Sequence, residues 1–149
     1  MKTNARPPVR TQRVLSYEEA RLLLDAALAK AAEIDVPASV AVLDATRELA
    51  AFGRQDGAPH LTGEVAVAKA YTSASLRQPS GNLAAATAPT GPFFGLAHGS
   101  SRALITFAGG FPLMVDGDVV GAVGASGGSL EEDDTIARAA LELFEGWNR

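Results

Sequence analysis

The chain has 149 residues, of which 47% are hydrophobic and 20% are charged, a composition typical of a single globular domain. The absence of cysteine excludes disulfides, thiolate metal sites, iron–sulfur clusters and a cysteine nucleophile. A net charge of −4 without a dense basic stripe argues against nucleic acid as a partner, and no apolar run approaches the roughly 18 residues of a membrane span.

The N-terminal residues are basic and include two adjacent prolines, but they contain no apolar segment like that of a secretory signal. We therefore expect residues 1–13 to form a flexible tail, residues 14–149 to form one domain, and the protein to be cytoplasmic. Alanine and glycine are abundant and only 6% of the residues are aromatic. Because small side chains bury little apolar area, we also expect the core to gain stability from oligomerisation.

A first helix is predicted from Ser16 to about Glu33. Ser16 and Glu19 have the spacing of a capping box, in which each side chain bonds to the other residue's backbone N–H. Apolar residues recur behind them at helical intervals, and Pro37 follows the end of the pattern. The helix therefore has one apolar stripe that must pack against another element.

Two short strands, residues 38–44 and 48–54, come next and are predicted to pair as a hairpin. An alanine-rich helix is predicted over residues 62–77, and Pro79 ends it. Residues 79–102 contain several prolines and glycines and show no clear period. Loops of this length inside a compact domain are usually functional or mobile, so this is the first place where we expect a site.

The last third of the chain is predicted to add three strands and a closing helix. The strands are residues 103–107, 111–115 and 118–126. The dipeptide Asp116-Gly117 lies between the last two and is the strongest hairpin signal in the chain, typical of a type I′ turn. A second capping box at Ser129 opens the helix. The predicted order α-β-β-α-β-β-β-α is that of an α/β fold in which helices flank an antiparallel sheet.

Histidine is scarce, with only His60 and His98 in the chain. His98 follows Phe93, Phe94 and Gly95; because glycine admits a flat macrocycle and aromatic rings pack against it, His98 is a candidate haem axial ligand. The alternative is a loop histidine that bonds only to backbone. His60 lies close to the start of the second helix, and we interpret it as a surface residue.

Two glycines interrupt the apolar string FAGGFPL at residues 107–113. This pattern indicates a bulge, or a close approach of the backbone to a ligand or a subunit. Together with the loop at residues 91–99, the string would form a pocket with apolar walls and backbone polar groups. The pocket residues that we predict are Phe93, Phe94, Gly95, His98, Gly109, Gly110, Phe111 and Pro112.

Lys69 lies among alanines in the middle of the second helix. Its side chain is either solvated or a pocket lysine that receives a carboxylate. Glu64 lies five residues earlier and so is not on the same face of the helix. The glycine-rich residues 124–129 open the last helix, and their N–H groups either hold an anion or simply form a tight turn.

Four segments of the chain carry a family resemblance: GGFPLMVDGDVVGAVGASGG at residues 109–128, VAVLD at 40–44, RQDGA at 54–58 and AKAYTSA at 68–74. They resemble the GlcG/HbpS family, which also includes the C-terminal domain of PduO-type proteins, and the resemblance extends from about Leu15 to Phe144. It implies a profilin-like fold and homo-oligomers from dimers to octamers. As a cofactor it implies haem or iron, and it supports His98 as the ligand or a pocket residue.

Three functional hypotheses follow. The first is a small-molecule-binding domain for haem, another tetrapyrrole or iron, with His98 as the iron ligand. The second is a cofactor-free enzyme or accessory protein that acts on a small anionic metabolite, in which Lys69 and nearby glycine N–H groups hold a carboxylate while His98 or Glu64 moves the proton. The third is an assembly subunit without chemistry of its own.

Overall fold

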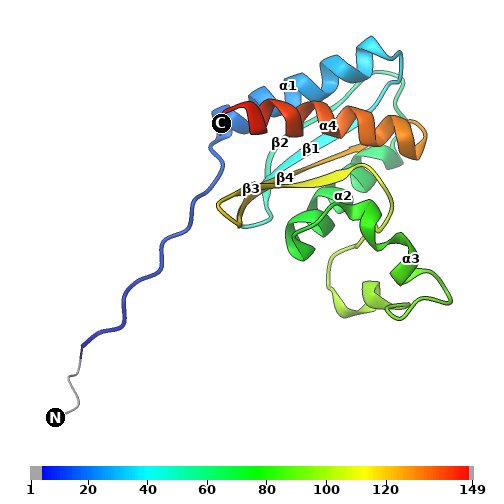
Figure 1. The fold of residues 1–149 in the computed structure, drawn as a ribbon. Helices are drawn as coiled ribbons and strands as arrows, with labels where there is room; N and C mark the ends of the chain where they lie inside the picture. Colours follow the sequence, from blue (N-terminus) through cyan, green and yellow to red (C-terminus); the bar gives the residue numbers. More distant parts are fainter. Residues whose placement is uncertain (1–4, 148–149) are drawn as a thin grey trace.

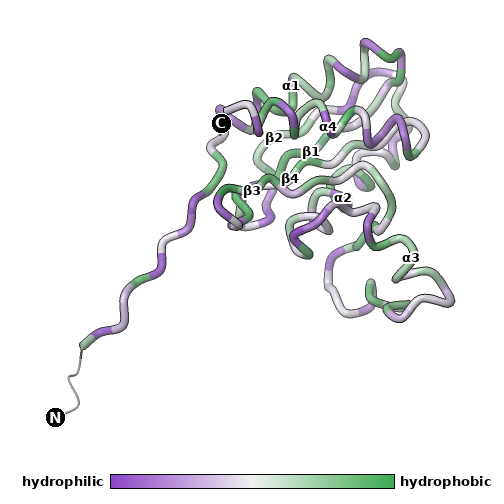
Figure 2. The backbone as a smooth tube through the Cα atoms, viewed as in Figure 1, coloured by the Kyte–Doolittle hydropathy of each residue, from purple (hydrophilic) through white to green (hydrophobic). Residues whose placement is uncertain are grey.

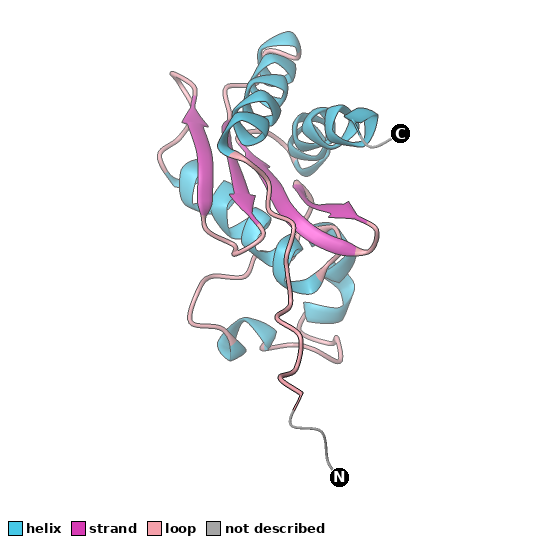
Figure 3. Ribbon diagram, turned by 90° about the vertical axis from the view of Figure 1, so that its left-hand side faces the viewer, coloured by secondary structure: helices cyan, strands magenta, loops and turns pink. Residues whose placement is uncertain are grey.

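The computed structural model describes residues 5–147 and places one antiparallel sheet between two helical layers. The helices α1 (Tyr17–Glu33) and α4 (Leu130–Trp147) cover one face, and α2 (Leu61–Leu76) covers the other (Figures 1 and 3). The strands are β1 (Ser39–Asp44), β2 (Leu49–Arg54), β3 (Gly110–Val115) and β4 (Asp118–Ser126), in the spatial order β2-β1-β4-β3.

The two capping boxes predicted from the sequence are both formed. The Glu19 backbone N–H donates to Ser16 Oγ at 3.2 Å, and the Ser16 N–H donates to Glu19 Oε2 at 2.9 Å. Ser129 and Glu132 make the same reciprocal pair at the start of α4. Each box satisfies N–H groups that have no partner inside the helix, so both helices begin where the sequence indicates.

The hairpin between β3 and β4 also confirms its sequence signal. Asp116 and Gly117 have φ values of 50° and 82°, and a type I′ turn requires positive φ at both central residues. The turn joins strands whose alternate residues face opposite layers: Phe111 and Leu113 belong to the cluster under α1 and α4. The turn, together with the register shift between Leu113 and Met114, therefore fixes which side chains of β3 enter the core.

The core is made of small residues because α2 lies directly on the backbone of the sheet. A side-chain methyl at Gly124 of β4 would collide with the carbonyl oxygen of Ala66 in α2. One at Gly110 of β3 would lie 2.5 Å from the carbonyl oxygen of Lys69. Larger residues at these positions would force the helix away from the sheet, so glycine and alanine here permit close packing.

The structure corrects the predicted strand at residues 103–107, and the sheet has four strands instead of five. The Ile105 N–H donates to Thr72 Oγ1 of α2, and the Phe107 carbonyl accepts from Ser80 Oγ. Side chains therefore bind this segment's backbone beside α2. The composition ALITF favours a strand locally, but tertiary contacts decide its conformation.

The segment between α2 and β3 contains three short helical turns: η1 (Ser80–Leu83), α3 (Ala84–Thr87) and η2 (Leu96–Gly99). Figure 1 shows the segment on the side of α2 that faces away from the sheet. It therefore lies on the same side of the sheet as α2.

The N-terminal residues 5–14 are extended and exposed, and their hydropathy is mostly polar (Figure 2). Arg13 pairs with Asp116 at 3.0 Å, and the Leu15 N–H donates to the Val120 carbonyl where the domain begins. The predicted tail starts at Met1, and its first four residues lie outside the described residues. None of the helices within residues 5–147 has both the length and the apolar character needed to cross a bilayer.

Candidate functional site

The predicted loop residues lie together on the surface. His98 is exposed and lies in η2, a helical turn that begins directly after Gly95. The φ of Gly95 is 90°, in the region that favours glycine. Phe93 and Phe94 are 59% and 66% exposed. Within residues 5–147, no three His, Cys, Asp or Glu side chains gather as a metal site. His98 therefore shares an exposed loop with two aromatic residues, and no cluster of further ligating side chains is found in the part of the chain that the structure describes.

The second half of the predicted pocket lies elsewhere. Gly109, Gly110, Phe111 and Pro112 are all buried. The glycines allow the close approach inferred from the sequence, and their neighbours belong to the same chain: Gly110 approaches the backbone of α2, and Gly109 approaches the Ala125 carbonyl of β4 and the Nζ of Lys69. Phe111 faces the α1 and α4 layer, where the Arg138 guanidinium lies 4.8 Å from its ring centre. The structure thus does not bring Phe111 together with the aromatic rings of the loop.

Lys69 is fully buried, which removes the alternative of a solvated side chain. Its Nζ donates to Asp133 Oδ2 at 2.7 Å and to the Ala125 carbonyl at 2.9 Å, and it lies 5.2 Å from the centre of the Phe107 ring. Burial lowers the pKa of Lys69, and the hydrogen bond and charge of Asp133 partly oppose this effect. The carboxylate that Lys69 receives therefore comes from its own chain.

The glycine-rich turn before α4 binds the same carboxylate. The Gly128 N–H donates to Asp133 Oδ1 at 2.9 Å, close to the positive end of the helix dipole. Both groups considered for a ligand anion, the lysine and this N–H, are thus bonded to Asp133. Glu64 is different, because its side chain is exposed and borders a groove.

That groove lies between β2 and α2 and has a volume of about 500 Å³. Its walls are largely apolar, since Leu49 and Phe52 are 52% and 42% exposed. His60 lies at the start of α2 in the same wall. We did not predict this groove from the sequence, where His60 was interpreted as a plain surface residue. The lining consists of Leu49, Phe52, Arg54, His60, Gly63, Glu64, Val67, Ala68, Tyr71, Arg102 and Ala103.

A β-bulge puts both large apolar side chains of β2 on the groove side. Val42 pairs with Ala51 but Leu43 pairs with Leu49, so Ala50 is the extra residue. Leu43 packs in the cluster under α2, and a residue directly opposite it points to the same face. Without the bulge, Leu49 would face α1. The sequence signals this bulge weakly: residues 48–54, ELAAFGR, contain more apolar residues than a strand with one buried face requires.

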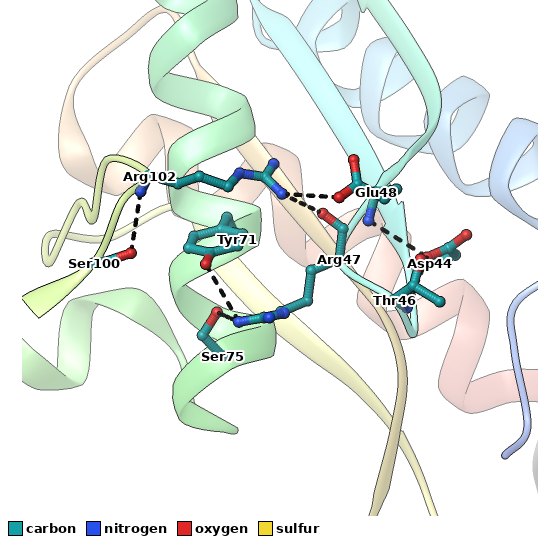
Figure 4. Close-up of polar contacts among 8 residues, drawn as sticks. All are labelled: Asp44, Thr46, Arg47, Glu48, Tyr71, Ser75, Ser100 and Arg102. Atoms are coloured by element: carbon teal, nitrogen blue, oxygen red, sulfur yellow. Dashed lines mark hydrogen bonds and ion pairs between the residues drawn. The ribbon is translucent and has the colours of Figure 1, made fainter.

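A cationic cluster borders the groove at Tyr71 (Figure 4). Arg47 Nη1 donates to Tyr71 Oη at 3.3 Å and to Ser75 Oγ at 3.2 Å. The guanidinium carbons of Arg102 and Arg47 lie 4.2 and 5.0 Å from the centre of the Tyr71 ring. Hydrogen bonding to Ser100, together with the two guanidinium charges, lowers the pKa of the tyrosine. The site therefore combines an apolar groove with positive charge at one end.

Comparison with known proteins places this arrangement in context. A family described as "Haem degrading protein HbpS-like" matches residues 15–142. An uncharacterized 15.0 kDa protein in the dhaT-dhaS intergenic region of Citrobacter freundii is 35% identical over 130 residues, which are 87% of this chain and 92% of that protein. The corrinoid adenosyltransferase PduO of Citrobacter freundii is 32% identical over 127 residues, 85% of this chain but only 38% of PduO.

Two solved structures share the fold over nearly their whole length. The Klebsiella pneumoniae protein ORFY superposes with a TM-score of 0.90 at 28% identity, covering 95% of this chain and 98% of that one. The complex of PduOC with heme superposes with a TM-score of 0.82 at 31% identity, covering 87% of this chain and 94% of the other. At these identities and coverages the comparison concerns the whole domain.

Proposed function

The chain belongs to the HbpS-like family, and we propose that it binds haem or a closely related tetrapyrrole. The observation that carries the proposal is the groove between β2 and α2, where a histidine lies beside exposed apolar side chains. The heme complex of PduOC, which shares the fold, supports the class of ligand.

The chemistry of the groove suits such a ligand. Haem has a flat apolar ring, an iron that accepts imidazole nitrogen, and carboxylates on one edge. Leu49 and Phe52 provide apolar area, His60 provides an exposed imidazole, and a guanidinium from Arg54 lies at the rim. Pockets of several hundred Å³ with few polar groups are typical of small-molecule sites. The second histidine, His98, is not part of this lining.

A haemin titration tests the proposal, because the chain has only two histidines and each can be removed separately. We expect a Soret band to grow to saturation at one haemin per chain. In the His60→Ala variant the band should shift and the affinity should fall, whereas His98→Ala should bind as the unaltered protein does.

The outcomes separate the two histidines. If His98→Ala loses the band and His60→Ala does not, the ligand is the histidine predicted from the loop and the groove assignment is wrong. If no saturable band forms with the unaltered protein, haem binding itself is refuted.

We also propose that the chain self-associates, as the family resemblance implied. Phe93 and Phe94 are exposed side by side on one loop, and adjacent exposed aromatic residues are common at protein interfaces. Light scattering after size exclusion, over a range of protein concentrations, should give a mass above that of one chain. A single-chain mass at every concentration would refute self-association.

A further inference from the structure

We propose that Arg47, Tyr71 and Arg102 form a carboxylate-binding subsite at the end of the groove. The subsite would receive the acidic edge of a ligand whose apolar body lies between β2 and α2. This inference rests on the proposed function and specifies which part of the ligand the cluster recognises.

The first argument is the arrangement of the two guanidinium groups. Both lie within about 5 Å of the Tyr71 ring centre, and Arg102 Nη1 also donates to the Arg47 carbonyl at 3.0 Å. Two like charges are therefore held close together by three separate elements: the β1–β2 turn, α2 and the loop before β3 (Figure 4). The ring face attracts each cation, but it carries no net charge that would neutralise them.

The second argument is the charge balance. Among residues 5–147, Glu48 is the one acidic side chain bonded to the cluster, at 3.3 Å from Arg102 Nη1. The nearby Asp44 carboxylate accepts from the Thr46 backbone N–H and hydroxyl, so it serves the turn. Within the described residues the side chain of Arg47 makes no ion pair and donates only to the hydroxyls of Tyr71 and Ser75. Arg47, Arg102 and Glu48, the charged side chains of the cluster and its one ion pair, thus sum to a formal charge of +1.

The third argument is the number of donors that remain. A guanidinium has five N–H donors, and the side-chain bonds described for Arg47 and Arg102 use only Nη1 of each. The Nη2 and Nε groups make no hydrogen bond to the rest of residues 5–147. A planar carboxylate can accept two parallel N–H bonds from one guanidinium, which is the strongest common form of this contact.

The fourth argument is position. Tyr71 and Arg102 line the groove, and Tyr71 and Arg47 line a second hollow of about 270 Å³ beside it. Tyr71 is therefore shared by both spaces. A ligand in the groove that extends past Tyr71 reaches the guanidiniums, whereas Lys69 is buried and bonded to Asp133. Arg54 also lines the groove, but it is a single guanidinium that donates to the Ala58 carbonyl. The paired guanidiniums at Tyr71 are therefore the place that we assign to the polar end of the ligand.

The backbone of Arg47 gives a further reason to treat it as a functional residue. Its φ of 68° lies in the left-handed region, where glycine or asparagine is favoured over arginine. Strained backbone of this kind is found more often at binding sites than elsewhere. Here the left-handed residue is the arginine whose side chain bonds to Tyr71.

The test compares haemin with its dimethyl ester, in which both carboxylates are neutral, at one detergent concentration. We expect the unaltered protein to bind haemin roughly tenfold or more tightly than the ester, since a charge-assisted hydrogen bond is worth about that much. Arg47→Met and Arg102→Met should each lose this preference. Both variants should keep the affinity for the ester, which also shows that they are folded.

The control is Arg21→Met, because Arg21 is a partly exposed arginine on α1 that pairs with Glu18 and Asp25. It removes the same charge without touching the groove, and it should bind both probes as the unaltered protein does. Arg47→Lys should recover only part of the preference, because lysine cannot make the bidentate contact.

The possible failures are distinguishable. Equal binding of haemin and ester by the unaltered protein, or unchanged preference in both methionine variants, refutes the subsite and leaves haem binding intact. Absence of binding to either probe refutes the proposed function and the subsite with it. Loss of preference in Arg21→Met as well shows a general charge effect and also refutes the subsite.

Discussion

Removing the Asp133 carboxylate should be one of the most destabilising single changes in this domain. In Asp133→Ala, the fully buried Lys69 loses its partner, whose Oδ2 lies 2.7 Å from Nζ in the unaltered protein. The ammonium then either stays uncompensated or gives up its proton, and both cost free energy. The Gly128 N–H loses its acceptor at the same time. Breaking a buried ion pair by removing one partner costs about 3–5 kcal/mol in the free energy of unfolding.

Thermal unfolding followed by circular dichroism measures this loss. For a domain of this size 1 kcal/mol corresponds to roughly 2–4 °C, so we expect the midpoint to fall by about 6–20 °C. The double variant Lys69→Met, Asp133→Leu should recover most of the loss, because apolar residues of similar volume leave no unpaired charge.

The neighbouring Asp134 provides the matched control. It lies in the same turn of α4 and pairs with Arg138 at 2.9 Å, but both side chains are partly exposed. Exposed pairs contribute little, so Asp134→Ala should change the free energy of unfolding by less than about 1 kcal/mol. Two results would contradict the stabilising role of the buried pair. One is a free energy of unfolding for Asp133→Ala within about 1 kcal/mol of that for Asp134→Ala. The other is a double variant that is as unstable as Asp133→Ala alone.

Three further predictions concern single residues. In a variant without the other tyrosine, the phenolate absorbance of Tyr71 should titrate below pH 10, because hydrogen bonding to Ser100 and the nearby guanidiniums lowers its pKa. Since the folded state releases this proton at a lower pH than the unfolded state, the free energy of unfolding should rise with pH between that midpoint and 10. A midpoint at or above 10 contradicts the assigned contacts. Arg47→Asn should change the free energy of unfolding by less than about 1 kcal/mol, because asparagine tolerates the left-handed backbone. The same variant should lose the preference for haemin over its dimethyl ester. A large loss of stability in urea titration would instead assign the arginine a structural role. Gly124→Ala should lower the free energy of unfolding by ~1–3 kcal/mol or more in the same assay, because its methyl collides with the backbone of α2. Gly99 has open space around it, so Gly99→Ala should change this free energy by less than about 0.5 kcal/mol. Similar losses of stability in the two glycine variants would contradict the close packing.

The parts of the fold that were predicted correctly depend on short-range chemistry. The capping boxes and the Asp116-Gly117 turn involve residues within three positions of one another, and their spacing alone determines the hydrogen bonds. The predicted strand at residues 103–107 fails because its backbone bonds to Thr72 and Ser80, which the local pattern does not reveal. Sequence reasoning from local patterns cannot weigh such contacts.

The site was harder to predict because it also depends on contacts between residues that are far apart in the sequence. The sequence left the partner of Lys69 open, and the carboxylate that it receives lies 64 positions later, at Asp133. The groove depends on a bulge at Ala50 that turns Leu49 toward α2, and a single extra residue in a strand has no clear signature in the sequence. The loop histidine was conspicuous because of its neighbours, whereas His60 became a candidate only when β2 and α2 were seen side by side.

The contact between α2 and the glycines of β3 and β4 has a consequence for redesigning ligand selectivity. Gly110 and Gly124 meet the helix backbone directly, so at these two positions no side chain separates the helix from the sheet and could be shortened or lengthened to move it. One wall of the groove is therefore fixed in place. Engineering for a larger or smaller ligand must act on the opposite wall, at Leu49 and Phe52, or on the loop that carries Arg102.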